Sequence, residues 1–245
     1  MIQKHTIRIE EEALQEVGMR YNKISICELG NQLTFKKETG KYDYQTGKEY
    51  YQNKSVKKHI SIDLNSKDGA LPLDLDFPLP FSLLKGFDLV TDYGTIEHVN
   101  NQFQVFKNVH DICKKQGLMI HIIPSIGSAK GHGRYYYSEE FMNELGKACS
   151  YKIIKVDRYT EDQSEKVPNP LILGIFLKEK DNEFISENVF NKLKGLEDSG
   201  DLRNTGNYEA TIRYKARRWK GAFIRSIMHP GEVYNKIKER LNLSK

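Results

Sequence analysis

Residues 23–32, KISICELGNQ, decide the fold of this chain. Ile24 and Ile26 alternate with other residues as they do in a strand, and the run ends in Glu28 followed by Gly30. A carboxylate at the end of a core strand is costly unless it meets hydrogen-bond donors. The stretch therefore predicts a strand that delivers polar groups to a glycine turn.

Strands and helices alternate along the rest of the chain. The patterns predict strands at 24–29, 59–65, 86–94, 118–124, 151–160 and 169–180, a short extended segment within 69–80, and helices at 9–20, within 36–58, at 101–117 and at 138–150, the last capped by Ser138. Such alternation is typical of an α/β sandwich with a largely parallel sheet.

Acidic residues stand at the ends of three successive predicted strands. Glu28, Asp63 and Asp92 each follow an apolar run. In open α/β sheets ligands bind beyond the carboxyl ends of the strands. These three ends therefore predict one binding site along a single edge of the sheet.

Composition bounds the class of protein. The 245 residues, 38% of them hydrophobic, suffice for one full core and an added lobe. No apolar run approaches the roughly 18 residues that cross a bilayer, and the first residues carry acids where a signal peptide would be apolar, so we expect a cytoplasmic protein. Cys27, Cys113 and Cys149 lack CxxC spacing and are expected to be core thiols.

Positive charge is concentrated near the end of the sequence. Residues 211–245 hold ten Lys and Arg against two Glu, a net +8, which leaves −3 for the remaining chain, since the whole is +5. An anionic partner, such as nucleic acid, a membrane surface or a phosphate-bearing substrate, would suit this tail. A solvated helical face explains the same charges without a partner.

Five segments together resemble the class I S-adenosylmethionine-dependent methyltransferases. They are ICELG, ISIDLN, FDLVTDYGTIEHV, VFKNVHDICKKQGLMIHIIP and GHGRYYYSEEF, in the order of that family and within roughly residues 20–180. The resemblance implies a Rossmann-like sandwich whose mostly parallel, seven-stranded sheet has its last strand antiparallel. It implies a cofactor-binding domain at 1–180, followed by a basic, mainly helical extension at 181–245.

The resemblance also implies S-adenosyl-L-methionine as the cofactor. Asp63 matches the acid that binds the ribose hydroxyls, and either Asp74 or Asp76 lies where the adenine amine is met. The implied cofactor contacts are Glu28, Gly30, Asn31, Gln32, Asp63, Leu64, Asp76, Asp92, Tyr93 and Gly94. Asn31, Gln32 and Leu33 stand where the family has further glycines, and without G-x-G-x-x-G a nicotinamide dinucleotide is not expected.

Two histidines are the candidates for catalysis on the molecule that would accept the methyl group. His98 closely follows the fourth strand of the resemblance, and His132 lies in the glycine-flanked loop GHGRYYYS. Each can take a proton from an acceptor or orient it. Arg134, Tyr135 and Tyr136 are candidate substrate contacts. His110 and His121 lie in apolar patterns and are expected in the core, and no cluster has metal-ligand spacing, so no metal site is expected.

These features favour a methyltransferase that acts on a small-molecule acceptor, at an oxygen of a sugar or related metabolite; the sugar is an analogy with similar sequences. An RNA methyltransferase is the first alternative, because Tyr214, Trp219 and Phe223 interleave with the basic residues of the tail. A cofactor-binding module without catalysis is the second. The oligomeric state is left open.

Overall fold

The computed structural model describes residues 4–35, 44–128, 131–160 and 169–206. The helices are α1 (Lys4–Glu16), α2 (Gly47–Asn53), α3 (Gln102–Ile112), α4 (Glu139–Ala148) and α5 (Glu187–Phe190). The strands are β1 (Ser25–Leu29), β2 (Leu33–Phe35), β3 (Tyr44–Thr46), β4 (Lys58–Ile62), β5 (Phe87–Tyr93), β6 (Cys113–Pro124), β7 (Tyr135–Tyr137), β8 (Lys152–Thr160), β9 (Pro170–Leu177) and β10 (Leu196–Asp198).

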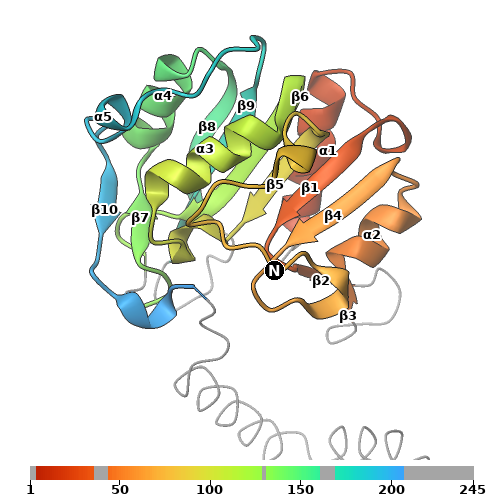
Figure 1. The fold of residues 1–245 in the computed structure, drawn as a ribbon, viewed down its shortest axis with the longest axis horizontal. Helices are drawn as coiled ribbons and strands as arrows, with labels where there is room; N and C mark the ends of the chain where they lie inside the picture. Colours follow the sequence, from red (N-terminus) through yellow and green to blue (C-terminus); the bar gives the residue numbers. More distant parts are fainter. Residues whose placement is uncertain (1–3, 36–43, 129–130, 161–168, 207–245) are drawn as a thin grey trace, which may run out of the picture. The chain divides into compact units, whose positions relative to one another are not determined.

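The main sheet has the strand order β4-β1-β5-β6-β9-β8 (Figure 1). Strands β4, β1, β5 and β6 pair in parallel. Strand β9 runs antiparallel to both of its neighbours, β6 and β8, and is the last strand of this sheet in the sequence. This arrangement confirms the predicted α/β sandwich, with its mostly parallel sheet and antiparallel final strand.

Six strands form this sheet within the described residues, where the resemblance implies seven. Beyond β4, the extended segment expected within 69–80 makes a single parallel bridge, between Ile62 and Leu71. Pro72 follows directly, and Pro78 and Pro80 lie a few residues on. Because proline has no N–H to donate to a ladder, the segment cannot continue as a paired strand.

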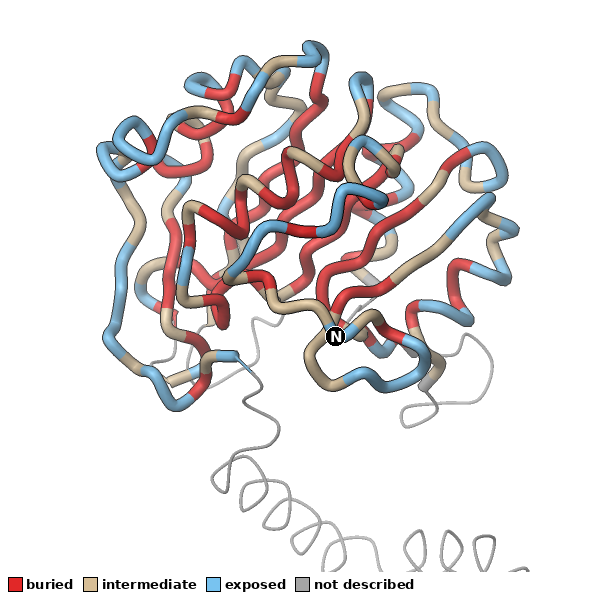
Figure 2. The backbone as a smooth tube through the Cα atoms, viewed as in Figure 1, coloured by how far each residue is buried: buried red, intermediate tan, exposed pale blue. Residues whose placement is uncertain are grey.

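The central strands of the sheet are buried along most of their length (Figure 2). Their side chains alternate between the two faces of the sheet, and each face has its own core. One core lies under α3, α4 and α5, and it receives Val90 of β5 and Met119 of β6. The other lies under α1 and α2, and it receives Leu89 and Ile120 of the same strands. Cys27, Cys113 and Cys149 are buried and free, which confirms them as core thiols.

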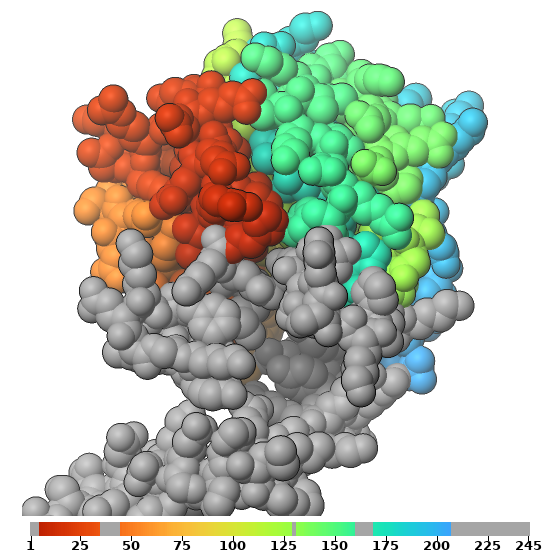
Figure 3. Space-filling view, turned by 180° about the vertical axis from the view of Figure 1, so that it is seen from behind, coloured from red at the N-terminus to blue at the C-terminus, as the bar shows by residue number. Residues whose placement is uncertain are grey.

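Helix α1 covers one face of the sheet and carries a buried acid, Glu10. Seen from behind, it lies beside β8, where the rings of His5 and Tyr159 are 4.9 Å apart (Figure 3). Glu10 of α1 is buried and accepts hydrogen bonds from the hydroxyls of three tyrosines: Tyr21 at 2.7 Å, Tyr51 at 2.7 Å and Tyr93 at 2.5 Å. The carboxylate thus has the partners that its burial requires.

Three element boundaries differ from those predicted. Helix α1 starts at Lys4 and ends at Glu16, because Gly18 adopts φ +70° and turns the chain out of the helix. Helix α3 ends at Ile112, since Cys113 is already extended and pairs with Phe87 of β5. Within the predicted helical region 36–58, the structure has β3 and the short helix α2, and β3 pairs with β2, which lies just before the region; residues 36–43 lie outside the described part.

The compact unit reaches Gly206, beyond the expected boundary at residue 180. Phe184 and Phe190 enter the core under α3 and α4, and β10 pairs with β7. Residues 181–206 therefore belong to the folded body. The basic tail at 211–245 lies outside the described residues. None of the helices described has the length and apolar content of a membrane span.

Candidate functional site

The order in which strands are added to the sheet changes side at β1. Strand β4 lies on one side of β1 and β5 on the other, so the connections that leave the two inner strands run to opposite sides. This is a topological switch point, and the crevice outside the carboxyl ends of such strands is where open α/β sheets bind ligands. The turns after β1 and β5 are therefore where a ligand site is expected.

Gly30 makes the turn after β1 and needs to be glycine for two reasons. Its φ is +78°, which side chains rarely adopt. A Cβ at this position would lie 2.5 Å from Oγ1 of Thr95. That hydroxyl donates to the Leu29 carbonyl oxygen at 2.9 Å, and the Gln32 amide donates to Thr95 Oγ1 at 3.3 Å. The turns after β1 and β5 are thus fastened together at the switch point.

Asp63 stands at the end of β4, next to that turn. One carboxylate oxygen accepts from the Asn31 backbone N–H at 2.8 Å, and the other accepts from the Asn65 N–H at 2.8 Å. Asp63 and its neighbour Leu64 are half-buried. A carboxylate has about four lone-pair sites, so Asp63 retains acceptor capacity for the hydroxyls of a ligand. The backbone bonds hold it in place for that role.

Glu28 is fully buried one residue before the end of β1. Its Oε2 lies 3.1 Å from Nε2 of His59, and its Oε1 has no hydrogen-bond partner among the described residues. A Cβ on Gly47 would lie 2.2 Å from Oε1, so only glycine at the start of α2 fits against this carboxyl. Burial raises the pKa of Glu28 well above its usual range, and the Glu10 carboxylate raises it further.

The raised pKa of Glu28 predicts a specific change in pH-dependent stability. A carboxyl whose folded-state pKa lies above its unfolded value stabilises the fold fully only below the unfolded pKa, about 4.5, and that stability is lost as pH rises toward the folded pKa. Glu28→Gln should therefore gain unfolding free energy relative to wild type as pH rises above 4.5. Urea unfolding at a series of pH values measures the difference.

Glu12→Gln is the matched control for that series, because the Glu12 side chain is 68% exposed. Circular dichroism at low pH establishes that both variants fold. Wild-type and Glu28→Gln stability curves that stay parallel from pH 4.5 to 8 would contradict the assignment of a raised pKa to Glu28.

Asp92 and Tyr93, both expected to contact the cofactor, have partners inside the protein. Asp92 Oδ1 accepts from the N–H groups of Thr95 and Ile96, at 3.1 and 3.2 Å, and Oδ2 lies 3.0 Å from Nδ1 of His121. The Tyr93 hydroxyl donates to Glu10 on the opposite face of the sheet. Asp92 therefore anchors the turn after β5, and His121 is the core histidine that the sequence predicts.

The acids of the segment after β4 have local roles. Asp76 accepts from the Asn101 N–H at 2.7 Å and from the Asn100 side-chain amide at 3.1 Å, which ties the segment to the start of α3. Asp74 accepts from the Asp76 N–H at 3.0 Å. Both oxygens of Asp76 are thus engaged within the chain, whereas Asp74 uses one oxygen to accept from local backbone.

The expected substrate contacts at β7 are also bonded within the chain. Arg134 forms a bidentate ion pair with Asp198 of β10, at 2.8 and 2.5 Å, and the Tyr135 hydroxyl donates to the Asn100 carbonyl oxygen at 2.8 Å. The Tyr136 hydroxyl is buried and accepts from the Gly131 N–H at 3.2 Å. The Arg134 guanidinium therefore already has an acidic partner within the chain, Asp198.

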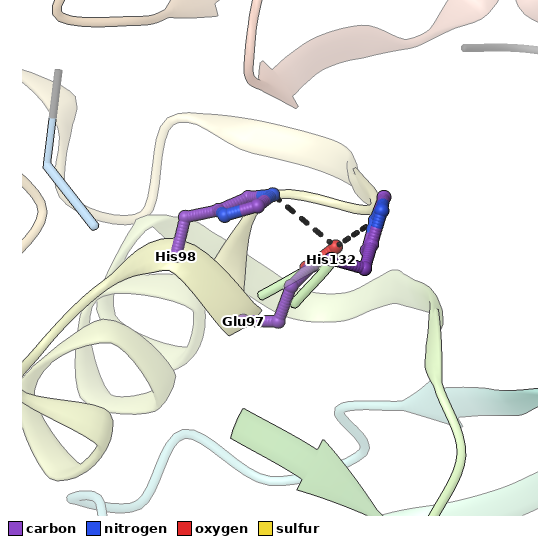
Figure 4. Close-up of side chains that lie close together, drawn as sticks. All are labelled: Glu97, His98 and His132. Atoms are coloured by element: carbon purple, nitrogen blue, oxygen red, sulfur yellow. Dashed lines mark ion pairs between the residues drawn. The ribbon is translucent and has the colours of Figure 1, made fainter. Parts of the chain in front are cut away.

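His98 and His132 converge on Glu97, a residue that the sequence did not single out (Figure 4). Glu97 Oε1 lies 3.3 Å from Nε2 of His132 and 3.6 Å from Nε2 of His98. Glu97 is fully buried, whereas 53% of the His132 side chain is exposed. Burial raises the pKa of the Glu97 carboxyl, but the two imidazoles lower it more, so the pKa lies below its usual value.

A turn and a loop bring this cluster together. Glu97 and His98 lie on the 3₁₀ turn Ile96–His98 that Asp92 anchors, and Gly94 before it adopts φ +83°. His132 arrives on the loop that follows β6. A Cβ on Gly133 would lie 2.6 Å from Cγ of Glu97, so glycine at this position permits the close approach of the loop.

Asn204, a second residue outside the sequence prediction, links the two histidines. Its carbonyl oxygen lies 2.6 Å from Nδ1 of His98, and its side-chain amide donates to the Gly131 carbonyl oxygen at 2.7 Å. Glu97 stands in the quoted motif TIEHV, so proximity to His98 was a usable signal for it. Asn204 lies more than a hundred residues from His98 in the sequence, and local pattern gives no sign of it.

No family model matches the chain, and no curated protein matches its sequence. The chain has a Rossmann-like α/β fold, with a mostly parallel sheet and an antiparallel last strand. A 1,6-didemethyltoxoflavin-N1-methyltransferase of Burkholderia thailandensis is similar, with 13% identity and a TM-score of 0.48 over 69% of this chain and 76% of that one. An S-adenosylmethionine-dependent methyltransferase of Mesorhizobium loti is also similar, with 14% identity and a TM-score of 0.45 over 68% of this chain and 97% of that one. One of Archaeoglobus fulgidus has 10% identity and a TM-score of 0.46 over 69% of this chain and 93% of that one. These likenesses are of fold.

Proposed function

We propose that this protein is a cytoplasmic S-adenosyl-L-methionine-dependent methyltransferase that acts on a small molecule, at an oxygen of a sugar or related metabolite. The observation that carries the proposal is the switch point, where the Gly30 turn lies against Asp63 and Thr95 at the carboxyl ends of three adjacent parallel strands. The sugar is the least constrained part, since it follows from the sequence resemblance alone.

The residues at the switch point fit the cofactor chemically. Asp63 offers a half-buried carboxylate with remaining acceptor capacity, which suits two vicinal ribose hydroxyls. Gly30 and Gly94 both adopt positive φ, which glycine tolerates best, so the backbone can turn sharply at this edge of the sheet. Asn31, Gln32 and Leu64 flank these positions and complete the cofactor side of the proposed site.

Glu97, His98 and His132 form the acceptor side of the proposed site. S-adenosyl-L-methionine, when bound, supplies an already activated methyl group. The protein then has to position the acceptor and exclude water, and a hydroxyl acceptor also has to lose its proton. The cluster is the group of titratable side chains beside the switch point that can lower the cost of this proton loss, and His98 and His132 are the catalytic residues of the proposal.

Calorimetry with S-adenosylhomocysteine tests the proposed function directly. The full chain is titrated with the ligand, and binding at one site per chain is the expected result. Titration with NAD as a comparison ligand should give no heat of binding, since the G-x-G-x-x-G turn is missing. A folded protein without affinity for S-adenosylhomocysteine would overturn the proposal. Binding without methyl transfer to any hydroxylated acceptor would favour the non-catalytic module instead.

Asp63→Ala should weaken S-adenosylhomocysteine binding by about 1.5–3 kcal/mol, the range for hydrogen bonds to a charged group. Asp68→Ala is the matched control, because Asp68 also bonds Asn31, through its side chain at 2.7 Å, but is exposed and outside the proposed contacts. Thermal unfolding establishes that both variants fold. Equal affinities in the two variants would reject the assignment of Asp63 to the ribose.

A further inference from the structure

Glu97 has a buried carboxylate that contacts two imidazoles but, among the described residues, has no well-aligned hydrogen-bond donor. None of its surface is exposed, and neither oxygen accepts a hydrogen bond from the residues that the structure describes. A buried polar group of this kind calls for an explanation, and an ion is one of the ordinary ones. Gly133 and Gly94 bring backbone close to the same side chain, so the protein has built a tight enclosure around an unsatisfied acid.

The spacing of the cluster matches the coordination shell of a small divalent ion. Four ligands at about 2.0–2.1 Å from a tetrahedral ion lie about 3.3–3.4 Å from one another. Glu97 Oε1 lies 3.3 Å from Nε2 of His132 and 3.6 Å from Nε2 of His98. Ligand atoms of the three side chains all lie within 4.8 Å of one another. Small side-chain rotations would bring them onto one ion.

The hydrogen bond of His98 presents the correct nitrogen to such an ion. Nδ1 lies 2.6 Å from the carbonyl oxygen of Asn204, which can only accept, so Nδ1 carries the proton. In the neutral ring the lone pair then resides on Nε2, the atom that faces Glu97. Metal-binding histidines usually donate their other N–H to a backbone carbonyl or carboxylate in this way.

We propose that Glu97, His98 and His132 bind a divalent first-row transition-metal ion of the Zn²⁺ type. Two imidazoles and one carboxylate suit these ions, whereas Mg²⁺ and Ca²⁺ prefer sites made of oxygen alone. Three protein ligands leave at least one coordination position open, as in catalytic zinc sites. The exposed side of His132 gives the ion a route from solvent.

One consequence of the metal site rests on the proposed function. The open coordination position would take the hydroxyl oxygen of the acceptor, because a bound divalent ion makes an oxygen ligand easier to deprotonate. His98 and His132 would then act on the acceptor as ligands of the ion, and the proton of the hydroxyl would pass to solvent water at the exposed side of His132. Binding of the ion itself needs neither the cofactor nor the acceptor.

Zinc titration of the full chain tests the proposal. The protein is stripped with a chelator, titrated with Zn²⁺ by calorimetry, and analysed for bound metal after dialysis. We expect one Zn²⁺ per chain, a higher Tm in its presence, and no uptake of Mg²⁺ at the same concentration. Glu97→Gln and His132→Ala should each weaken binding more than about 100-fold, beyond the 10- to 100-fold effect of altering a residue behind the ligands.

His5→Ala is the control variant, since His5 lies on α1 on the opposite face of the sheet from α3. It should bind Zn²⁺ like the wild type. Circular dichroism establishes folding, and Glu97→Gln keeps the shape of the side chain it replaces. No Zn²⁺ uptake by wild type, or uptake that is equal in Glu97→Gln, His132→Ala and His5→Ala, would overturn the proposal.

The zinc and S-adenosylhomocysteine titrations fail independently. Zinc uptake that depends on Glu97, in a protein without affinity for S-adenosylhomocysteine, would overturn the proposed function and support the metal site. Affinity for S-adenosylhomocysteine in a protein that takes up no Zn²⁺ would overturn the metal site alone.

Discussion

Replacing His98 with alanine should lower kcat by roughly 10²–10⁴-fold on the acceptor of this protein, the usual contribution of a group that handles a proton in the transition state. The affinity for S-adenosylhomocysteine should change by less than about 1 kcal/mol, because the Asp63 side of the proposed site makes the cofactor contacts. Turnover is measured as release of S-adenosylhomocysteine, once a screen of hydroxylated small molecules has identified an acceptor.

The His98 experiment needs a variant that separates chemistry from folding. His98 is buried, and its Nδ1 donates to the Asn204 carbonyl oxygen, so alanine leaves that oxygen without its partner. His98→Asn can retain a donor for Asn204 while it removes the imidazole Nε2 that faces Glu97. Both variants should be slow, and His5→Ala should turn over at the wild-type rate.

Retention of the wild-type rate in His98→Asn would contradict a role for His98 in the reaction. Loss of rate in His98→Ala together with full rate in His98→Asn would show that the bond to Asn204, and hence the docking of residues 202–206, is what the reaction needs. The comparison therefore tells a catalytic imidazole from one that only holds the turn.

The succession of strands and helices along the chain, and the edge of the sheet that carries the acids, follow from the sequence because both depend on local pattern. Alternation of apolar residues in 23–32 sets which side chains enter each face, and Gly30 marks the turn. The acids that end the strands locate the edge. Asp63 is a candidate for the same reason, since it directly follows a strand that ends in buried residues.

Side-chain partners that come from distant parts of the chain could not be predicted from the sequence. Asp92 follows the same rule as Asp63, yet its side chain points into the core and bonds His121 of the neighbouring strand. Arg134 is matched by Asp198, on a strand that pairs with β7 only after the chain has passed through α4 and α5. The type of a residue predicts the chemistry it can do, but the packing of the sheet decides what meets it.

The prediction of no metal site and the proposed zinc site differ for a similar reason. Glu97 and His98 are adjacent in the sequence, but His132 lies on another loop, so the three residues have no metal-ligand spacing along the chain. The loop approaches because Gly133 has no Cβ to collide with Glu97. A glycine between a histidine and an arginine carries no metal signature, although it decides whether the three side chains can meet.

Asp92→Ala should lower the free energy of unfolding by about 3–5 kcal/mol, the cost of removing one partner from a buried pair. The substitution leaves His121, which is 2% exposed, without its carboxylate, and it leaves the N–H groups of Thr95 and Ile96 without their acceptor. Because Asp92 anchors the turn that carries Glu97 and His98, its loss should loosen both the core and the acceptor side of the proposed site. Urea unfolding at pH 7 measures the effect.

Two further variants calibrate the Asp92 result. Asp92→Asn keeps one oxygen for the N–H groups of Thr95 and Ile96 and an amide beside His121, so it should lose less stability than Asp92→Ala. Asp157→Ala removes an acid whose side chain is 48% exposed and should stay within about 0.5 kcal/mol of wild type. If Asp92→Ala unfolds at the same urea concentration as Asp157→Ala, the pair with His121 does not anchor the turn. Asp92 would then again be a candidate cofactor contact, as the sequence resemblance implies.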